Sequence, residues 1–210
     1  TLYNSQLDVL YDLGGWMDPV GLKALSIKPA PQMFKWVGGQ SVTTGLHSFD
    51  GWIGDIWQSP ASMQSLYTEP LIAIKGGYAT YAPPPYMPKA PKVRRDVPVI
   101  FSNPAKLSRS FLSYLQTIPG KKCFLHQQFK YPQARVQVLK YLPSHEVEFI
   151  TPTSHKEALE VLGQHYLMID TFPYSGGLTA QEALALGVKV QARAGTLFCE
   201  RHSAKAMTVS

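Results

Sequence analysis

The stretch Ile169–Ala183, which reads IDTFPYSGGLTAQEA, decides the fold class of this chain. An apolar run ends at Asp170, a short loop carries Gly176 and Gly177, and a segment with helical periodicity begins near Leu178. We therefore predict a strand, a tight turn and a helix. Such a turn gathers backbone N–H groups at the positive end of a helix dipole, where an anion can bind. The alternative is that the two glycines only make a tight connection.

Around this stretch, segments typical of strands and helices alternate regularly. The predicted strands cover residues 97–102, 122–126, 147–150, 166–170 and 188–191, and the predicted helices cover residues 106–118, 132–141, 154–163 and 178–186. Five strands alternating with four helices predict an α/β fold with a parallel, doubly wound Rossmann-type sheet. Ligands of such sheets bind at the carboxyl ends of the strands. The loops at 102–106, 151–156 and 171–179 therefore border the expected site.

The amino-terminal part predicts a piece of another α/β lobe. A strand at 7–13, a helix from Pro19 to about residue 27 and a strand at 33–37 form a βαβ unit. Residues 38–65 are rich in Gly, Ser, Thr and Trp and predict a functional loop region with short elements at most. Residues 79–98 are rich in proline and predict a stiff connector. We therefore divide the chain into 1–90, the end of the first lobe with its connector, and 91–210, the second lobe.

Composition narrows the class of protein. With 210 residues, of which 45% are hydrophobic and 16% charged, the chain can bury a core. It has neither an apolar run of membrane-spanning length nor a secretory signal, so we expect a soluble, cytoplasmic protein. The net charge of +6 comes from scattered basic residues without an aromatic-basic motif, so we expect no nucleic-acid partner. Cys123 and Cys199 predict packed thiols rather than a disulfide or metal site.

The two ends of the sequence suggest a fragment. The chain begins at Thr1 rather than Met, and it stops at Ser210 inside a predicted helix at 198–209. We interpret it as a piece of a longer protein.

Charged and hydroxyl side chains fall on the loops that border the expected site. Lys106 follows the first strand of the second lobe and Lys156 follows the third, so both can neutralise a diphosphate or contact a base. Thr179 adds a hydroxyl in the first helical turn, and Glu182 can accept hydrogen bonds from ribose hydroxyls. Taken singly, each lysine is more often a solvated surface charge. Among the six histidines, which lack metal-ligand spacing, His126 at a strand end is the one to test.

A second loop in the first lobe carries glycines and hydroxyl groups. Residues 38–45 follow a predicted strand and can face the same ligand, with Thr43, Thr44 and Gly45 as candidate donor-binding residues. The loop matches neither the dinucleotide-binding nor the P-loop pattern, so it is weak evidence by itself.

These residues resemble a known family. Residues 169–179 with residues 182–184 are similar to the donor loop of the O-GlcNAc transferase family of SPINDLY type, including its bacterial relatives. The resemblance extends to residues 28–32, which parallel an arginine-proline-alanine-proline run, to residues 34–38, and to residues 195–197 with Arg201. It therefore spans nearly the whole chain.

The resemblance implies a GT-B glycosyltransferase. Such an enzyme transfers GlcNAc or another hexose from a UDP-sugar to a protein side chain, with inversion and without a required metal. Lys106 matches the family lysine that stabilises the leaving diphosphate, and Asn103 lies near the nucleotide. Lys156 matches a lysine that contacts the uridine, and Glu182 replaces an acidic residue that binds the ribose. The donor-loop residues implied are Ser175, Gly176, Gly177, Leu178 and Thr179.

The chain also departs from the family pattern. The frequent glycine-histidine-threonine-threonine loop is here Gly176-Gly177-Leu178-Thr179, which lacks the histidine and one threonine. The loop at 38–45 is one residue longer, and the family's acceptor-side histidines fall upstream of Thr1. Two alternatives therefore stay open. One is a catalytically inactive nucleotide-binding or scaffold module. The other is a GT-B enzyme with a lipid or glycan acceptor, for which Trp52–Trp57 would supply an apolar surface.

Overall fold

The computed structural model describes residues 2–36 and 43–208, which form two compact units. Unit 1 comprises Thr1–Thr80 and Thr196–Arg201, and unit 2 comprises Tyr81–Gly195 and His202–Ser210. The chain therefore leaves unit 1 after Thr80 and returns to it for one short segment. Unit 2 begins at Tyr81, whereas composition placed the change between residues 90 and 91.

A five-stranded parallel sheet organises unit 2. Its strands are β5 (Val99–Phe101), β6 (Lys122–Leu125), β7 (Val147–Ile150), β8 (Leu167–Ile169) and β9 (Lys189–Gln191). They lie in the order β7-β6-β5-β8-β9, and every pair is parallel. From β5 the chain adds β6 and β7 on one side, and it then adds β8 and β9 on the other side. This order confirms the predicted doubly wound sheet.

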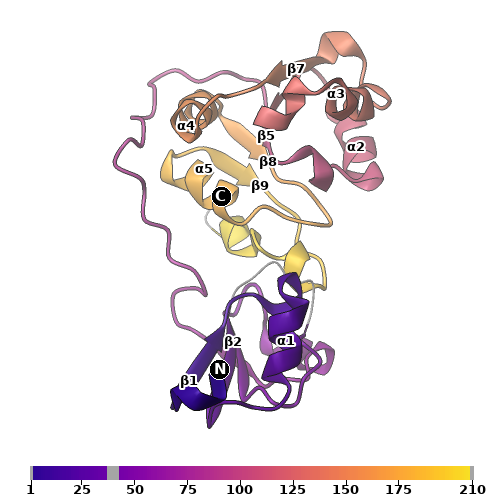
Figure 1. Cartoon of the computed structure of the whole chain (residues 1–210). Coiled ribbons are helices and arrows are strands. Elements are labelled where there is room, and N and C mark those ends of the chain that lie inside the picture. The colour runs from indigo at the N-terminus through magenta and orange to yellow at the C-terminus, as the bar shows by residue number, and fades with distance from the viewer. Residues whose placement is uncertain (1, 37–42, 209–210) are drawn as a thin grey trace. The chain divides into compact units, whose positions relative to one another are not determined.

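Helices cover both faces of this sheet. They are α2 (Arg109–Gln116), α3 (Pro132–Leu139), α4 (His155–Gly163) and α5 (Leu178–Ala185). Helices α2 and α3 lie on one face, and α4 and α5 lie on the other (Figure 1). Side chains alternate along β5, so Val99 and Phe101 join the core under α4 and α5 while Ile100 joins the core under α2 and α3. Among the described residues, no helix has the length and apolarity to cross a bilayer.

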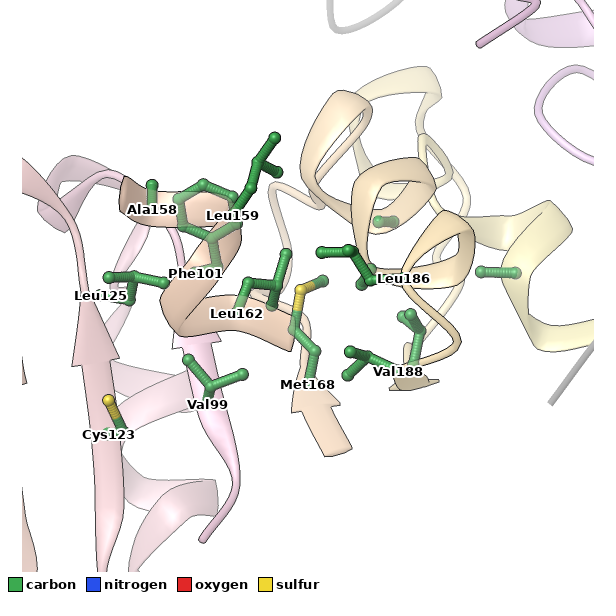
Figure 2. Packing of buried hydrophobic residues seen from close by; sticks show 14 residues of the cluster. Val99, Phe101, Cys123, Leu125, Ala158, Leu159, Leu162, Met168, Leu186 and Val188 are labelled. Carbon is green, nitrogen blue, oxygen red and sulfur yellow. The ribbon is translucent and has the colours of Figure 1, made fainter. Parts of the chain in front are cut away.

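Apolar packing fixes α4 and α5 against the sheet. Leu159 and Leu162 of α4 and Leu186 after α5 pack with Val99 and Met168 from the central strands (Figure 2). All five side chains are buried. Burial of each such side chain contributes about 1.5–3 kcal/mol, so this cluster holds the strand ends in place.

Two predicted helices differ from the structure. The helix predicted at 106–118 begins only at Arg109, because the Asn103 carboxamide caps a separate 3₁₀ turn (Pro104–Lys106) and Ser108 caps α2. Lys106 therefore precedes the helix.

The helix predicted at 198–209 is wrong. Two 3₁₀ segments, Phe198–Glu200 and Ala204–Thr208, replace it. The Glu200 carboxylate accepts the N–H groups of Thr196 and Leu197, and the N–H of His202 donates to the Ser175 hydroxyl. The Ser175 hydroxyl thereby takes an N–H that a helix would use, whereas the Glu200 carboxylate caps the first 3₁₀ segment.

Unit 1 contains a four-stranded parallel sheet. Its strands, in spatial order, are β1 (Val9–Asp12), β2 (Gln32–Trp36), β3 (Gly51–Gly54) and β4 (Leu71–Ala73). Helix α1 (Pro19–Leu25) connects the first two strands, and the Asp18 carboxylate caps it. This confirms the predicted βαβ unit. Strand β3 is one short element of the predicted loop region, and β4 follows that region.

The returning segment completes the core of unit 1. Trp52 of β3 is fully buried and makes edge contacts with Tyr67 and Phe198, each at 5.1 Å between ring centroids. Trp52 therefore cannot contribute to an exposed, sugar-stacking surface, and that part of the glycan-acceptor alternative is wrong.

Candidate functional site

The loops after β5 and β8 meet where the strand order of unit 2 reverses. Lys106, on the loop after β5, donates from Nζ to the carbonyl oxygen of Ser175 at 3.1 Å. Its ammonium also lies 4.5 Å from the centre of the Tyr174 ring. Ser175 and Tyr174 belong to residues 171–177, called the glycine loop below. The structure thus brings Lys106 and the glycine loop together at the topological switch point, where ligands of such sheets bind.

A buried carboxylate shapes the glycine loop. The N–H of Gly176 lies 2.9 Å from both carboxylate oxygens of Asp170, and the N–H of Thr171 donates to Oδ1 at 2.9 Å. A Cβ at Gly176 would lie 2.6 Å from Asp170 Oδ1 and 2.5 Å from Thr179 Oγ1. The residue must therefore be glycine for this close approach. Sequence reasoning missed the organising role of Asp170, because its contact with the Gly176 N–H depends on how the loop packs.

Burial raises the pKa of the Asp170 carboxyl. Hydrogen bonds from Gly176 and Thr171 and the charge of Lys106 oppose this rise, since they favour the ionised form. The loop N–H of Gly176 serves this carboxylate. The anion-binding N–H groups that we predict are therefore those at the start of α5.

The amino terminus of α5 follows the glycine loop directly. Gly177 is the N-cap, Leu178 is the first helical residue with 59% of its surface exposed, and Thr179 is half-buried. The first N–H groups of a helix lack intrahelical acceptors and form the positive end of the helix dipole. With Lys106 close to the same loop, two sources of positive potential converge here.

Glu182 lies one turn into α5 and is buried. Its Oε1 is 2.7 Å from Nε2 of His155, the first residue of α4, and His155 Nδ1 is 3.0 Å from the Tyr86 hydroxyl. Burial raises the pKa of Glu182, and the hydrogen bond and charge of His155 oppose this rise. Sequence reasoning missed His155. The cap at Ser154 fixes where α4 begins, but a contact 27 residues away has no local signal.

Lys156 and Asn103 occupy different surroundings from Lys106. Lys156 is exposed and lies 3.9 Å from the Glu160 carboxylate on the next turn of α4. The Asn103 side chain accepts the N–H of Ala105 at 2.9 Å and so shapes the loop that carries Lys106. The nucleotide contacts predicted for these two residues stay predictions.

A pocket of about 280 Å³ opens beside α4 at the carboxyl ends of β5, β6 and β7. Its apolar wall comes from Phe101, Pro152 and Ala158, and its polar lining comes from His126, Gln127, Thr153, Ser154 and His155. Burial lowers the pKa of His126. The pocket has the size and mixed lining of a small-molecule site.

His202 lies beside Tyr174, and the charge of Lys106 acts on its imidazole. Its ring centroid is 5.6 Å from that of Tyr174. Burial and the Lys106 charge lower the pKa of His202 to about 4, so this ring is neutral at pH 7. Sequence reasoning assigned it no role, because the histidines lack metal-ligand spacing.

In unit 1, the described part of the predicted donor loop is held by Glu69. The Thr43 hydroxyl donates to this carboxylate at 2.5 Å, and the N–H of Thr44 donates to it at 2.8 Å. The Thr44 hydroxyl also donates to Glu69. Both threonine side chains are thus engaged within unit 1, while Gly45 is exposed. Residues 38–42 of this loop lie outside the described residues.

Neither unit shows a metal centre in its described part. Across residues 2–36 and 43–208, no group of three or more His, Cys, Asp or Glu side chains is arranged to hold a metal ion. Cys123 and Cys199 are buried thiols, as predicted.

A parallel sheet with a lysine and a glycine loop at its switch point defines the class, a Rossmann-like ligand-binding lobe of the GT-B type. Comparison with solved structures supports this assignment. A lysine-to-methionine variant of the O-GlcNAc transferase from Thermobaculum terrenum superposes with a TM-score of 0.88 and 24% sequence identity, over 99% of this chain and 42% of that one. The fold is therefore that of a GT-B protein.

Sequence comparison shows which proteins with this fold the chain resembles in sequence. The chain is 24% identical over 211 residues to a probable UDP-N-acetylglucosamine–peptide N-acetylglucosaminyltransferase SPINDLY from Solanum lycopersicum, and 25% identical over 213 residues to its namesake from Oryza sativa subsp. japonica. Each match covers 91% of this chain and 22% of the relative, so the chain spans about a fifth of their length. No family model matches the chain. The predicted resemblance to SPINDLY-type O-GlcNAc transferases is confirmed.

Proposed function

We propose that this chain is part of a cytoplasmic glycosyltransferase that moves a sugar from a UDP-sugar to a protein side chain. The observation that carries the proposal is the contact between Lys106 and the glycine loop at the switch point of unit 2. The printed names of the SPINDLY relatives, which specify UDP-N-acetylglucosamine and a peptide, support this donor and acceptor class. The proposed donor sugar is GlcNAc or another hexose.

The diphosphate lies between Lys106 and the start of α5 in this proposal. Transfer of the sugar breaks its bond to the diphosphate, and negative charge develops on the leaving UDP. The Lys106 ammonium and the N–H groups of the first turn of α5 are fixed before the reaction, so they stabilise this charge without reorganising. This charge stabilisation supports a metal-independent reaction. Inversion follows if the acceptor attacks from the face opposite the leaving UDP.

The nucleoside extends from the diphosphate toward α4. The ribose hydroxyls donate to the Glu182 carboxylate, which His155 holds through Oε1. The base enters the pocket beside α4, where Phe101 and Pro152 supply apolar contacts. In this arrangement the positive groups contact the diphosphate, Glu182 contacts the ribose, and the apolar wall contacts the base. These three parts follow one another in the same order in UDP.

A second candidate function is a nucleotide-sugar-binding module without turnover. The observation that favours it is Leu178, an exposed apolar residue at the first position of α5, where the family motif has a polar residue. This change removes a hydrogen-bonding group from the region of the donor sugar. UDP binding depends on Lys106 in both candidates, whereas UDP release in the presence of acceptor belongs to the enzyme alone.

The decisive experiment replaces Lys106 by alanine in the longer protein that contains this chain. We expect Lys106→Ala to lower UDP release from a UDP-sugar in the presence of protein acceptor by roughly 100-fold or more, since it removes a preorganised charge. The control is Lys121→Ala, which removes an exposed lysine before β6. Circular dichroism should show the same fold for both variants. Transfer by Lys106→Ala at the unmodified rate would refute the mechanism, and UDP binding without any release would favour the module.

A further inference from the structure

His126 stands at the carboxyl end of β6, on the wall of the pocket beside α4. Its Nδ1 accepts the backbone N–H of Gln128 at 3.2 Å, as the cap of the following 3₁₀ turn. A nitrogen that accepts a hydrogen bond carries a lone pair, so the proton of the neutral ring is on Nε2. The lowered pKa of this imidazole keeps the ring neutral near pH 7. The backbone therefore fixes Nε2–H as the ring's remaining polar group, a donor.

The neighbouring side chains of the pocket are already engaged. Ser154 Oγ accepts the N–H of Glu157 at 3.2 Å, and Thr153 Oγ1 donates to the Glu157 carboxylate at 2.7 Å. Both ring nitrogens of His155 are bonded, one to Tyr86 and one to Glu182. Within the described part of the chain, His126 and Gln127 are thus the pocket side chains whose N–H groups remain for a ligand, and the Ser154 hydroxyl keeps its own hydrogen.

The remaining wall cannot distinguish one pyrimidine from another. Phe101, Pro152 and Ala158 offer apolar surface to the flat faces of a base, and every base has such faces. A half-buried donor with a fixed proton does distinguish them, because a ligand that presents its own donor leaves both groups unsatisfied. Gln127 can turn its carboxamide, and the Ser154 hydroxyl can rotate, to present either a donor or an acceptor, so neither excludes a base. Fixed discrimination in this pocket therefore falls to the edge of the base that meets His126.

We propose that His126 is a specificity-determining residue, whose Nε2–H donates to the carbonyl oxygen at the 4-position of the base. Uracil carries an oxygen there, whereas cytosine carries an amino group, which would place donor against donor. The inference rests on the proposed function, since it assumes that a nucleoside diphosphate occupies the site. The inference goes beyond the proposed function because it names His126 as the residue that selects UDP over CDP.

Calorimetry with UDP and with CDP tests this assignment on the chain itself. We expect the unmodified chain to bind UDP at least tenfold more tightly than CDP, roughly the value of one hydrogen bond and its mismatch. His126→Phe should lose this preference by weakening UDP binding, while His126→Gln, which keeps an N–H donor at a similar reach, should retain part of it. The matched control, His145→Phe, changes an exposed histidine outside the pocket and should leave both affinities unchanged.

A measurement on the unmodified chain keeps the test valid if a variant fails to fold. The ¹⁵N–¹H resonance of His126 Nε2 should shift when UDP binds and should respond differently to CDP. Equal binding of UDP and CDP, or an undiminished UDP preference in folded His126→Phe, would overturn the assignment of His126 alone. Failure of the unmodified chain to bind UDP at all would instead remove the proposed function and the inference with it.

Discussion

At the scale of single residues, the site depends on a buried carboxylate that never needs to touch the ligand. Asp170 accepts hydrogen bonds from the glycine loop, at 2.9 Å from the N–H of Gly176 and 2.9 Å from that of Thr171. This fixes the path of the loop and places the Ser175 carbonyl where Lys106 donates to it. The glycine loop therefore orients Lys106, and both are proposed to bind the same diphosphate.

The close approach of Gly176 to Asp170 leads to a stability prediction. A methyl group at Gly176 would lie 2.5 Å from Thr179 Oγ1 and 2.6 Å from Asp170 Oδ1. We therefore expect Gly176→Ala to lower the free energy of unfolding by about 1–3 kcal/mol, the usual cost of overpacking. Urea unfolding of the chain measures this change.

The control is Gly163→Ala at the end of α4. Its Cβ would meet Leu186 at 3.7 Å, an ordinary contact, and alanine favours a helix over glycine. This variant should be as stable as the unmodified chain or more so. Equal stability of Gly176→Ala and Gly163→Ala would show that the loop does not need its glycine.

Some residues of the site could be predicted from the sequence, and others could not. Lys106 and the glycine loop could be placed together, because alternating strands and helices put both after strands of one parallel sheet. The pairs Asp170–Gly176 and His155–Glu182 were not predicted, since they depend on where side chains pack. Lys156 lies in the first turn of α4, and its contact with the nucleotide stays a prediction. Its neighbour His155 contacts Glu182 in the structure.

At the scale of elements, short capped turns decide where the functional side chains lie. The 3₁₀ turn at Pro104–Lys106 and the cap at Ser108 separate Lys106 from α2. The Ser108 hydroxyl accepts the N–H of Phe111 at 3.1 Å and donates to the carbonyl of Phe172 at 2.7 Å. One side chain therefore joins the start of α2 to the glycine loop.

Removal of this link should be measurable. We expect Ser108→Ala to lower the free energy of unfolding by about 1 kcal/mol, because a helix cap and a bond to the glycine loop are both lost. Chemical denaturation provides the measurement. Ser113→Ala, at an exposed position inside α2, is the matched control and should be neutral or slightly stabilising. If both variants unfold at the same denaturant concentration, Ser108 does not have this linking role.

The same element scale explains the failed helix predictions. The sequence from 198 to 209 has helix-forming residues, but the Ser175 hydroxyl binds the N–H of His202, which a helix would use. The Ser175 partner lies 27 residues away from His202, so local propensity could not indicate it. The strands of unit 2 were predicted well. Strands β5 and β6 are buried along their whole length, and turns bound each strand.

At the scale of the whole molecule, the proposed nucleotide site belongs to one unit. Lys106, the glycine loop, Glu182 and the pocket beside α4 all lie between Tyr81 and Gly195. The chain nevertheless spans 22% of the length of its SPINDLY relatives and 42% of the bacterial O-GlcNAc transferase structure. The proposed nucleotide binding can therefore be tested on this chain.

Isothermal titration calorimetry of the 210-residue chain with UDP tests the central claim most directly. The site in unit 2 predicts binding of one UDP per chain, and Lys106→Ala should weaken this binding at least tenfold, since a charge-assisted contact to phosphate is lost. Lys121→Ala should bind as the unmodified chain does. Absence of UDP binding to the folded chain, or equal affinities for the unmodified chain and Lys106→Ala, would contradict the claim that Lys106 and the glycine loop form a UDP site.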